Sequence, residues 1–157
     1  MSKIEVNGRC FGKLKKLAQT VAEKVIELMN FPNDLEVSIN FVSEKEIKRL
    51  NSEFRGIDRV TDVLSFPSFQ LSAGENLDVE NEAVSIYRQD NGLIHFGDMA
   101  LCLKQTRRQA KDFDVSVDFE IKKLVIHSML HLMGYDHIDD KDYEIMKTQE
   151  EKLENLI

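Results

Sequence analysis

The stretch "HSMLHLMGYDH", His127 to His137, holds three of the chain's four histidines and lies among apolar residues. A histidine in an apolar setting must find partners for its ring nitrogens, because an unpaired buried polar group costs about 1–3 kcal/mol. Residues four apart share one face of a helix, so we expect His127 and His131 to point the same way. Gly134 suits the left-handed conformation that ends a helix, and a chain that turns back there would bring His137 to the same point. The spacing therefore predicts a metal site.

The predicted site has three neutral imidazole ligands and a fourth position open to water or substrate. That donor set is typical of a catalytic zinc site, because structural zinc sites fill all four positions with protein side chains. We expect one Zn²⁺ per chain, and another divalent transition metal would also accept three imidazoles. His95 lies outside the cluster in "GLIHFGD" and is interpreted as an ordinary strand or turn residue, since a lone histidine usually pairs with a backbone carbonyl.

The histidine spacing matches the metzincin protease pattern H-E-x-x-H-x-x-G-x-x-H at every position except one. In that pattern the glutamate after the first histidine is the general base that activates the zinc-bound water. This chain has Ser128 there, and a hydroxyl does not take up a proton near neutral pH as a carboxylate does. The pattern predicts the ligand geometry of a metzincin helix and disfavours peptide hydrolysis by that route. A metalloprotease-like hydrolase remains an alternative.

Outward from this stretch, local patterns predict five helices and several strands. Apolar residues at helical spacing predict helices at about residues 13–29, 43–54, 104–112, 117–133 and 141–156. Ser43 and Glu46 form a capping-box pattern at the start of the second of these helices. Alternating apolar residues predict strands at about residues 4–6, 35–42 and 61–67, and a hairpin of two strands within residues 84–103 around Asp90-Asn91-Gly92.

These elements predict an α+β fold in one domain over residues 1–157. We expect a mixed sheet of about four strands packed by about five helices, one of which is the metzincin-like zinc-site helix. A chain of 157 residues is long enough to bury about 68–70% of the surface that its unfolded form exposes. The patterns do not predict the order of the strands.

The cysteines and the N-terminus bear on where the protein acts. Cys10 and Cys102 lie far apart and form no CxxC pair, and "MSKIEVNGRC" lacks the apolar core of a signal peptide. The expected location is therefore the reducing cytoplasm. No apolar run approaches the roughly 18 residues that would cross a bilayer, so we expect no membrane partner.

The net charge of −7 is unfavourable for binding phosphates, but it is unevenly distributed. Residues 71–90 carry five acids and one arginine, residues 138–157 carry seven acids and three lysines, and the remainder is nearly neutral. The segments "KEIKRLNSEFRGIDR" (45–59) and "KQTRRQAK" (104–111) could supply a basic face beside the histidines. They could equally be ordinary solvated helix faces.

Three blocks of sequence resemble the YbeY family of metal-dependent endoribonucleases. "HSMLHLMGYDH" is similar to the family's H-G-x-L-H-L-x-G-Y-D-H, with Ser128 in place of the usual glycine. "LNSEFRGIDRVTDVLSFP", residues 50–67, resembles the stretch in which an arginine after an aromatic residue precedes T-D-V-L-S-F-P. "FGDMALCL", residues 96–103, resembles the family's G-D-I-x-I-S strand. The order and spacing of the blocks fit from about Leu35 to the C-terminus.

The resemblance implies a zinc-dependent, single-strand-specific endoribonuclease that acts in ribosomal RNA processing and maturation and in ribosome quality control. It implies His127, His131 and His137 as zinc ligands and Arg55 as the functional arginine near the metal. The expected partners are ribosomal RNA and ribosomal or GTPase proteins, with no DNA. Besides the protease, a second alternative is a metal-stabilised ribosome-binding factor without catalysis. Ser128 is expected to affect local packing or the shape of the pocket.

Several charged residues allow two interpretations. Arg55 could neutralise phosphate charge, as a guanidinium binds two phosphate oxygens at once, or form a structural salt bridge to Asp58 or Asp62. Asp136 could fix a histidine tautomer or cap the turn that follows the helix. Asp62 and Asp98 could line the cleft or bond to the local backbone. The sequence identifies no general base and leaves open whether water or the 2′-hydroxyl of the RNA attacks.

Overall fold

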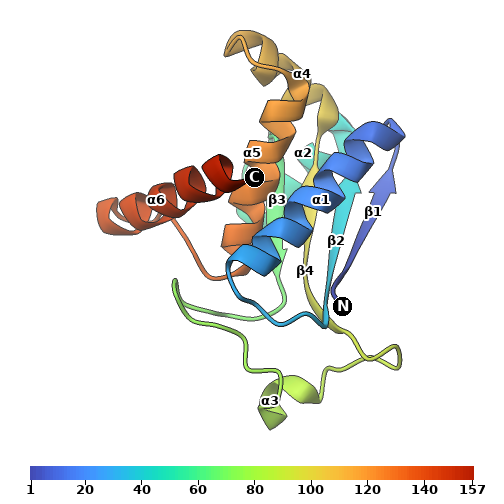
Figure 1. Cartoon of the computed structure of the whole chain (residues 1–157). Coiled ribbons are helices and arrows are strands. Elements are labelled where there is room, and N and C mark those ends of the chain that lie inside the picture. The colour runs from blue at the N-terminus through green and yellow to red at the C-terminus, as the bar shows by residue number, and fades with distance from the viewer.

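The alternating segments form one mixed sheet of four strands (Figure 1). The computed structural model describes all 157 residues. The strands are β1 (Lys3–Gly8), β2 (Leu35–Phe41), β3 (Val63–Pro67) and β4 (Ile94–Leu101). They lie in the order β1-β2-β4-β3, in which β1, β2 and β4 are parallel and β3 runs antiparallel to β4. β3 is therefore an edge strand with one side unpaired.

Six helices surround the sheet, and α5 is the central one. They are α1 (Gly12–Leu28), α2 (Glu44–Arg55), α3 (Glu82–Ser85), α4 (Leu103–Asp112), α5 (Val117–Leu132) and α6 (Asp140–Leu156). α1 and α5 lie side by side on one face of the sheet, and α5 also contacts α4, α6 and β3 (Figure 1). None of these helices combines the length and apolar character that crossing a membrane requires.

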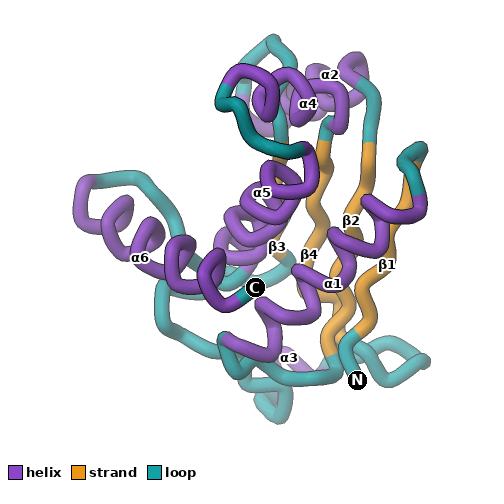
Figure 2. Tube along the Cα trace, turned by 45° about the horizontal axis from the view of Figure 1, so that its top comes forward, coloured by secondary structure: helices purple, strands orange, loops and turns teal.

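The core forms on the face that carries α1 and α5. The alternation predicted for β2 is confirmed, because Leu35, Val37, Ile39 and Phe41 are buried and join a cluster of 28 buried residues that includes both helices. On the opposite face, Ile47 of α2 packs in a separate cluster of four buried residues with side chains from β3 and β4. α2 and α4 lie near each other at one end of the sheet (Figure 2). The α+β fold and the five predicted helices are confirmed.

The predicted hairpin is wrong in its first strand. Residues 84–89 are not a strand, because the Asn81 side chain caps the one-turn helix α3 that precedes Ile86. Arg88 then makes only an isolated bridge to β4, and its guanidinium donates to Asp34 at 2.7 Å. The turn itself is present, with Gly92 at φ 84°. Asn91 does not take the positive φ that a two-residue hairpin turn needs.

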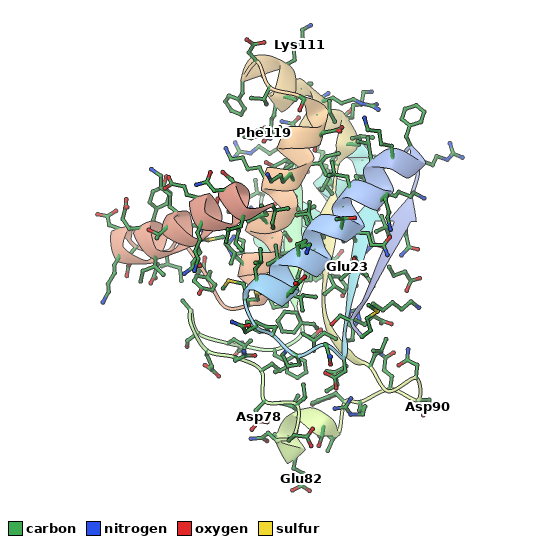
Figure 3. All side chains as sticks on the ribbon, in the orientation of Figure 1. Glu23, Asp78, Glu82, Asp90, Lys111 and Phe119 are labelled. Carbon is green, nitrogen blue, oxygen red and sulfur yellow. The ribbon has the colours of Figure 1, made fainter.

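The acidic segment 71–90 lies apart from the basic residues of α4 (Figure 3). Asp78, Glu82 and Asp90, from the acidic segment 71–90, lie at the opposite end of the molecule from Lys111 of α4 (Figure 3). Three of the eight basic residues of α2 and α4 are ion-paired, since Arg49 binds two glutamates of its own helix and both Lys104 and Arg108 bind Glu44. These three ion-paired residues fit the interpretation as ordinary solvated helix faces.

Gly97 of β4 allows α5 to approach the sheet. A Cβ at Gly97 would lie 2.7 Å from Cδ2 of Leu132 and 2.9 Å from the carbonyl oxygen of Phe66. We expect Gly97→Ala to lower the free energy of unfolding by about 1–3 kcal/mol, because the extra methyl overpacks this contact. Urea denaturation followed by circular dichroism measures the change. Gly12→Ala is the matched control, since a Cβ there meets nothing within 4 Å. Equal unfolding midpoints for the two variants would contradict the prediction.

Candidate metal centre

The end of α5 is built so that the chain turns back on the helix. Ser116 caps the N-terminus by accepting a hydrogen bond from the Phe119 amide, and the last helical residue is Leu132. Gly134 then takes φ 97°, as its position in the sequence predicts. A Cβ at Gly134 would overlap the backbone carbonyl of Leu71, so only glycine fits this contact. The reversal carries the following residues back toward α5.

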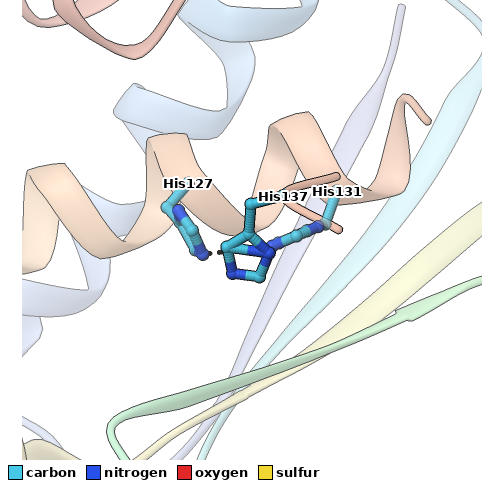
Figure 4. Close-up of side chains that lie close together, drawn as sticks. All are labelled: His127, His131 and His137. Atoms are coloured by element: carbon cyan, nitrogen blue, oxygen red, sulfur yellow. Dashed lines mark hydrogen bonds between the residues drawn. The ribbon is translucent and has the colours of Figure 1, made fainter. Parts of the chain in front are cut away.

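Three imidazoles converge at this reversal (Figure 4). The Nε2 atoms of His127 and His131 are 3.1 Å apart, on successive turns of α5. His137 approaches them from the loop after the helix, and one ring nitrogen from each of the three residues lies within 4.8 Å of the others. His127 and His131 are half-buried and His137 is exposed. The structure thus brings together the three residues that the spacing predicts.

The outer nitrogens of the two helical histidines are held by hydrogen-bond acceptors. His127 donates from Nδ1 to Oε1 of Glu150 at 3.1 Å, and His131 donates from Nδ1 to the carbonyl oxygen of Tyr135 at 2.9 Å. Because both partners are acceptors, the proton sits on Nδ1 and the Nε2 lone pairs face one another. A histidine that binds a metal is usually oriented in this way.

The protonation state of His131 also suits a metal ligand. Burial, reinforced by the neighbouring His127, lowers the pKa of His131 to about 4, so its imidazole is neutral at neutral pH. A metal ligand must be unprotonated, and this neutral ring offers its lone pair without first losing a proton. Asp136 accepts from the His137 amide at 2.8 Å and lies 3.4 Å from its Nδ1. Both predicted roles of Asp136 correspond to a contact with His137, and the contact that caps the turn is the shorter one.

The donor set fits a zinc ion. A tetrahedral ion with bonds of about 2.0–2.1 Å to imidazole separates two ligand nitrogens by about 3.3 Å. The 3.1 Å between the Nε2 atoms of His127 and His131 is close to that value. His137 is exposed, so its ring is free to adjust toward the pair. Three imidazole nitrogen donors without a fourth protein ligand match the donor chemistry of catalytic zinc sites.

The imidazoles line an open cleft of about 1220 Å³. Its walls come from β3 and the loop after it, the C-terminal ends of α2 and α4, one face of α5, and Glu150 of α6. Arg55, the last residue of α2, lies in this wall and is exposed. It makes no ion pair, so the predicted alternative of a salt bridge to Asp58 or Asp62 is wrong. The same cleft therefore holds the histidines and an arginine that is free to bind an anion.

Asp62 lines the cleft and also bonds locally. Its Oδ1 accepts from the Val63 amide at 2.7 Å, and its Oδ2 accepts from Nε2 of Gln109 at 3.1 Å. Both interpretations of Asp62 therefore hold. Its hydrogen bonds attach the start of β3 to α4 at the rim of the cleft.

Asp98 and His95 lie outside the cleft, on strand β4. The ring of His95 bonds to Asp98 through Nε2 at 2.9 Å and to Glu36 of β2 through Nδ1 at 3.1 Å. Partial burial alone would lower the pKa of His95, but these two carboxylates raise it overall. His95 is thus a strand residue paired by side chains rather than by a backbone carbonyl, and Asp98 does not line the cleft.

Ser128, which stands where the pattern H-G-x-L-H-L-x-G-Y-D-H has glycine, is buried between α5 and the sheet. Its Oγ lies 2.7 Å from Oγ of Ser65 in β3, and one hydroxyl donates to the other. The hydroxyl of Ser128 is thereby satisfied inside the core. It ties the helix of the histidines to the strand that forms the opposite wall of the cleft.

An α+β domain with three convergent imidazoles in an open cleft has the architecture of a mononuclear metal-dependent hydrolase. The sequence model of the family described as Endoribonuclease YbeY matches residues 4–157. The chain belongs to the endoribonuclease YbeY family. It is therefore an enzyme, a nuclease of the hydrolase class, as the resemblance predicts.

Individual relatives support the same assignment. The chain is 35% identical over 142 residues to endoribonuclease YbeY of Thermoanaerobacter sp. (strain X514), which covers 89% of this chain and 85% of the relative. It is 36% identical over 157 residues to the protein of that name from Clostridium botulinum (strain Kyoto / Type A2), covering 97% and 90%. The solution structure of TM1509 from Thermotoga maritima matches with a TM-score of 0.57 at 31% identity, covering 98% and 90%.

Glu150 is a site residue that the sequence does not mark. It comes from α6, 23 residues after His127, and it accepts the Nδ1 proton of that histidine. We expect Glu150→Gln to weaken zinc binding by about 10–100-fold, because the neutral amide is a poorer acceptor and leaves His127 less basic. Competition with a chromophoric zinc chelator measures the affinity.

Glu151→Gln is the matched control for this prediction, since Glu151 is an exposed neighbour on the same helix with no bond to the histidines. The control is expected to bind zinc as the wild type does. Equal affinities for the two variants would show that the carboxylate of Glu150 does not tune the site.

Proposed function

We propose that the chain is a zinc-dependent, single-strand-specific endoribonuclease that acts in the processing and maturation of ribosomal RNA and in ribosome quality control. The observation that carries the proposal is the convergence of three imidazole nitrogens within 4.8 Å in a cleft that also presents Arg55. Membership of the endoribonuclease YbeY family supports RNA as the substrate. In this proposal residues 1–157 form one hydrolase domain.

His127, His131 and His137 would hold the ion through their ring nitrogens. Bound there, zinc would supply Lewis acidity to a phosphate oxygen and lower the pKa of a coordinated water toward about 7. Glu150 and the Tyr135 carbonyl fix the rings of His127 and His131, so these ligands are already oriented when substrate arrives.

Arg55 would bind the phosphate that is cleaved. A guanidinium can donate to two phosphate oxygens at once and can neutralise the charge that grows in the transition state. Arg55 is exposed in the cleft and has no carboxylate partner, so no protein ion pair must break before it binds the substrate. Its position at the end of α2, just before Gly56 with φ 69°, fixes where its side chain starts.

Unpaired nucleotides suit the aromatic wall of the cleft. Phe54 is 59% exposed, and its ring packs edge-to-face on Phe66 with centroids 5.1 Å apart. A base stacked on such a ring is worth about 1–3 kcal/mol, but it must first leave its own duplex. This cost for paired RNA supports a preference for single strands.

The two alternatives are less well supported. A metzincin-type protease needs a carboxylate at position 128, and Ser128 is buried and bonded to Ser65. A factor that needs metal in order to fold would have a small core, whereas this chain buries a cluster of 28 residues. We therefore favour catalysis on RNA.

A ribosomal substrate also suggests where and with what the protein acts. We place it in the cytoplasm, and its free cysteines, Cys10 and Cys102, are consistent with a reducing compartment. Ribosomal or GTPase proteins are the partners we propose for its delivery to the ribosome. DNA is not a proposed substrate.

Three preparations test the proposal: the wild type, His131→Ala and Arg55→Ala. Metal analysis is followed by cleavage of a labelled single-stranded ribosomal RNA fragment, with melting curves alongside. We expect chelation to abolish cleavage by the wild type without unfolding it, and His131→Ala to lose both metal and activity. Arg55→Ala is expected to retain metal and melting temperature and to lose about 10²–10³-fold in kcat.

Arg59→Ala is the control for Arg55→Ala, because Arg59 is exposed nearby but does not line the cleft. It is expected to cleave as the wild type does. Cleavage by the wild type that persists after all metal is removed would refute the proposed mechanism. Loss of fold on chelation would favour the alternative of a metal-stabilised binding factor.

A further inference from the structure

The cleft continues along α5 beyond the histidines. His131, His127, Leu124 and Glu120 are spaced four, three and four residues apart, so they form one stripe on the helix, and all four line the cleft. Glu120 is seven residues before His127, which places it about 10.5 Å along the helix axis from that ligand. A group bound by Glu120 is therefore a neighbour of the phosphate at the metal site and not that phosphate itself.

Glu120 is the one carboxylate in the cleft without a partner. Asp62 accepts from the Val63 amide and Gln109, Asp136 accepts from the His137 amide, and Glu150 accepts from His127. The carboxylate of Glu120 makes no hydrogen bond or ion pair, although the residue is only 3% exposed. The carboxylate oxygens of Glu120 keep contact with solvent at the cleft, so they are available to accept hydrogen bonds from a ligand.

The position of Glu120 in the first turns of α5 gives it a structural role as well. An acid near a helix N-terminus interacts favourably with the helix dipole. Asp118 fulfils that role from solvent, since it is half-exposed and pairs with Lys13 at 3.5 Å. The dipole therefore explains an acid in this turn, but it does not explain why Glu120 is buried in the wall of the cleft.

Two further side chains line the same cleft as Glu120. Lys123, one turn along α5, is exposed and makes no ion pair. Phe113, at the end of α4, is 64% exposed although it is aromatic, and it lines the same cleft. In a nucleotide site, an unpaired acceptor binds the hydrogen-bond donors of the base and a cation binds the phosphate. An exposed aromatic ring stacks on the face of the base.

We propose that Glu120, Lys123 and Phe113 form a subsite for an unpaired guanine next to the scissile phosphate. The subsite rests on the proposed endoribonuclease function. A carboxylate only accepts hydrogen bonds, and guanine is the base whose Watson–Crick edge presents two adjacent donors, the N1–H and the N2 amino group. Phe113 stacks on the base and Lys123 binds its phosphate. A second metal ion is a poorer occupant, because Glu120 has no further metal-ligating side chains grouped with it.

The test compares single-stranded RNAs that differ in one base. Uridine-rich oligonucleotides carry one guanine, or inosine or adenine in its place, and cleavage by the zinc-loaded enzyme is mapped and its kcat/KM measured. The wild type is expected to cut fastest next to guanine, and inosine, which lacks the N2 amino group, is expected to fall between guanine and adenine. Glu120→Gln is expected to reduce the guanine-to-adenine ratio by about 5–100-fold, because the amide cannot accept both bonds.

Asp118→Asn is the matched control, since it removes an acid from the same helix end without touching the cleft. If Glu120 only supports the helix dipole, both variants lower the melting temperature alike and neither changes the guanine-to-adenine ratio, which overturns the subsite. Equal wild-type rates on the guanine and adenine oligonucleotides also overturn it. In that case the proposed function still stands, because the wild type cuts RNA. If no RNA is cut while zinc is bound, the proposed function itself fails, and the subsite fails with it.

Discussion

The burial of α5 is the constraint on which the rest of the structure depends. Its apolar residues are packed on nearly every side, and the helix contacts α1, α4, α6 and β3. A helix that is buried in this way cannot rotate without breaking close packing, so the direction of His127 and His131 is fixed by the core. The approach of Leu132 to Gly97 and the bond between Ser128 and Ser65 set the distance between this helix and the sheet.

The features that the sequence predicts are those whose cause lies within a few neighbouring residues. The alternation of β2 and the N-cap at Ser43 each need only one short segment, and both are present. The histidine site belongs to the same group, because its three imidazoles and the reversal at Gly134 fall within eleven residues. Here the helix period and one positive φ within a short segment are enough to predict that the three side chains meet.

The features that the sequence misses depend on contacts between segments that are far apart. Glu150 reaches His127 only because α6 packs back on α5, and no local pattern records that packing. The hairpin prediction fails for a related reason. The Asn-Gly signal is local and correct as a turn, but helix α3 takes the place of the first strand, and Arg88, which bonds to Asp34 before β2, makes a single bridge to β4. Likewise, only the structure shows that Arg55 makes no ion pair, because the sequence does not give the positions of Asp58 and Asp62 relative to its side chain.

The lining of the cleft carries four carboxylates against the two cations Arg55 and Lys123, so its charge alone does not attract a polyanionic substrate. At physiological ionic strength the Debye length is about 8 Å, so the charges near a bound phosphate matter more than the net charge of −7. Near the site, Arg55 and Lys123 make no ion pair, whereas three of the four cleft carboxylates already accept hydrogen bonds from protein groups. Because two free cations give little general attraction for RNA, recognition must depend on the shape of the cleft and on the groups that contact individual nucleotides.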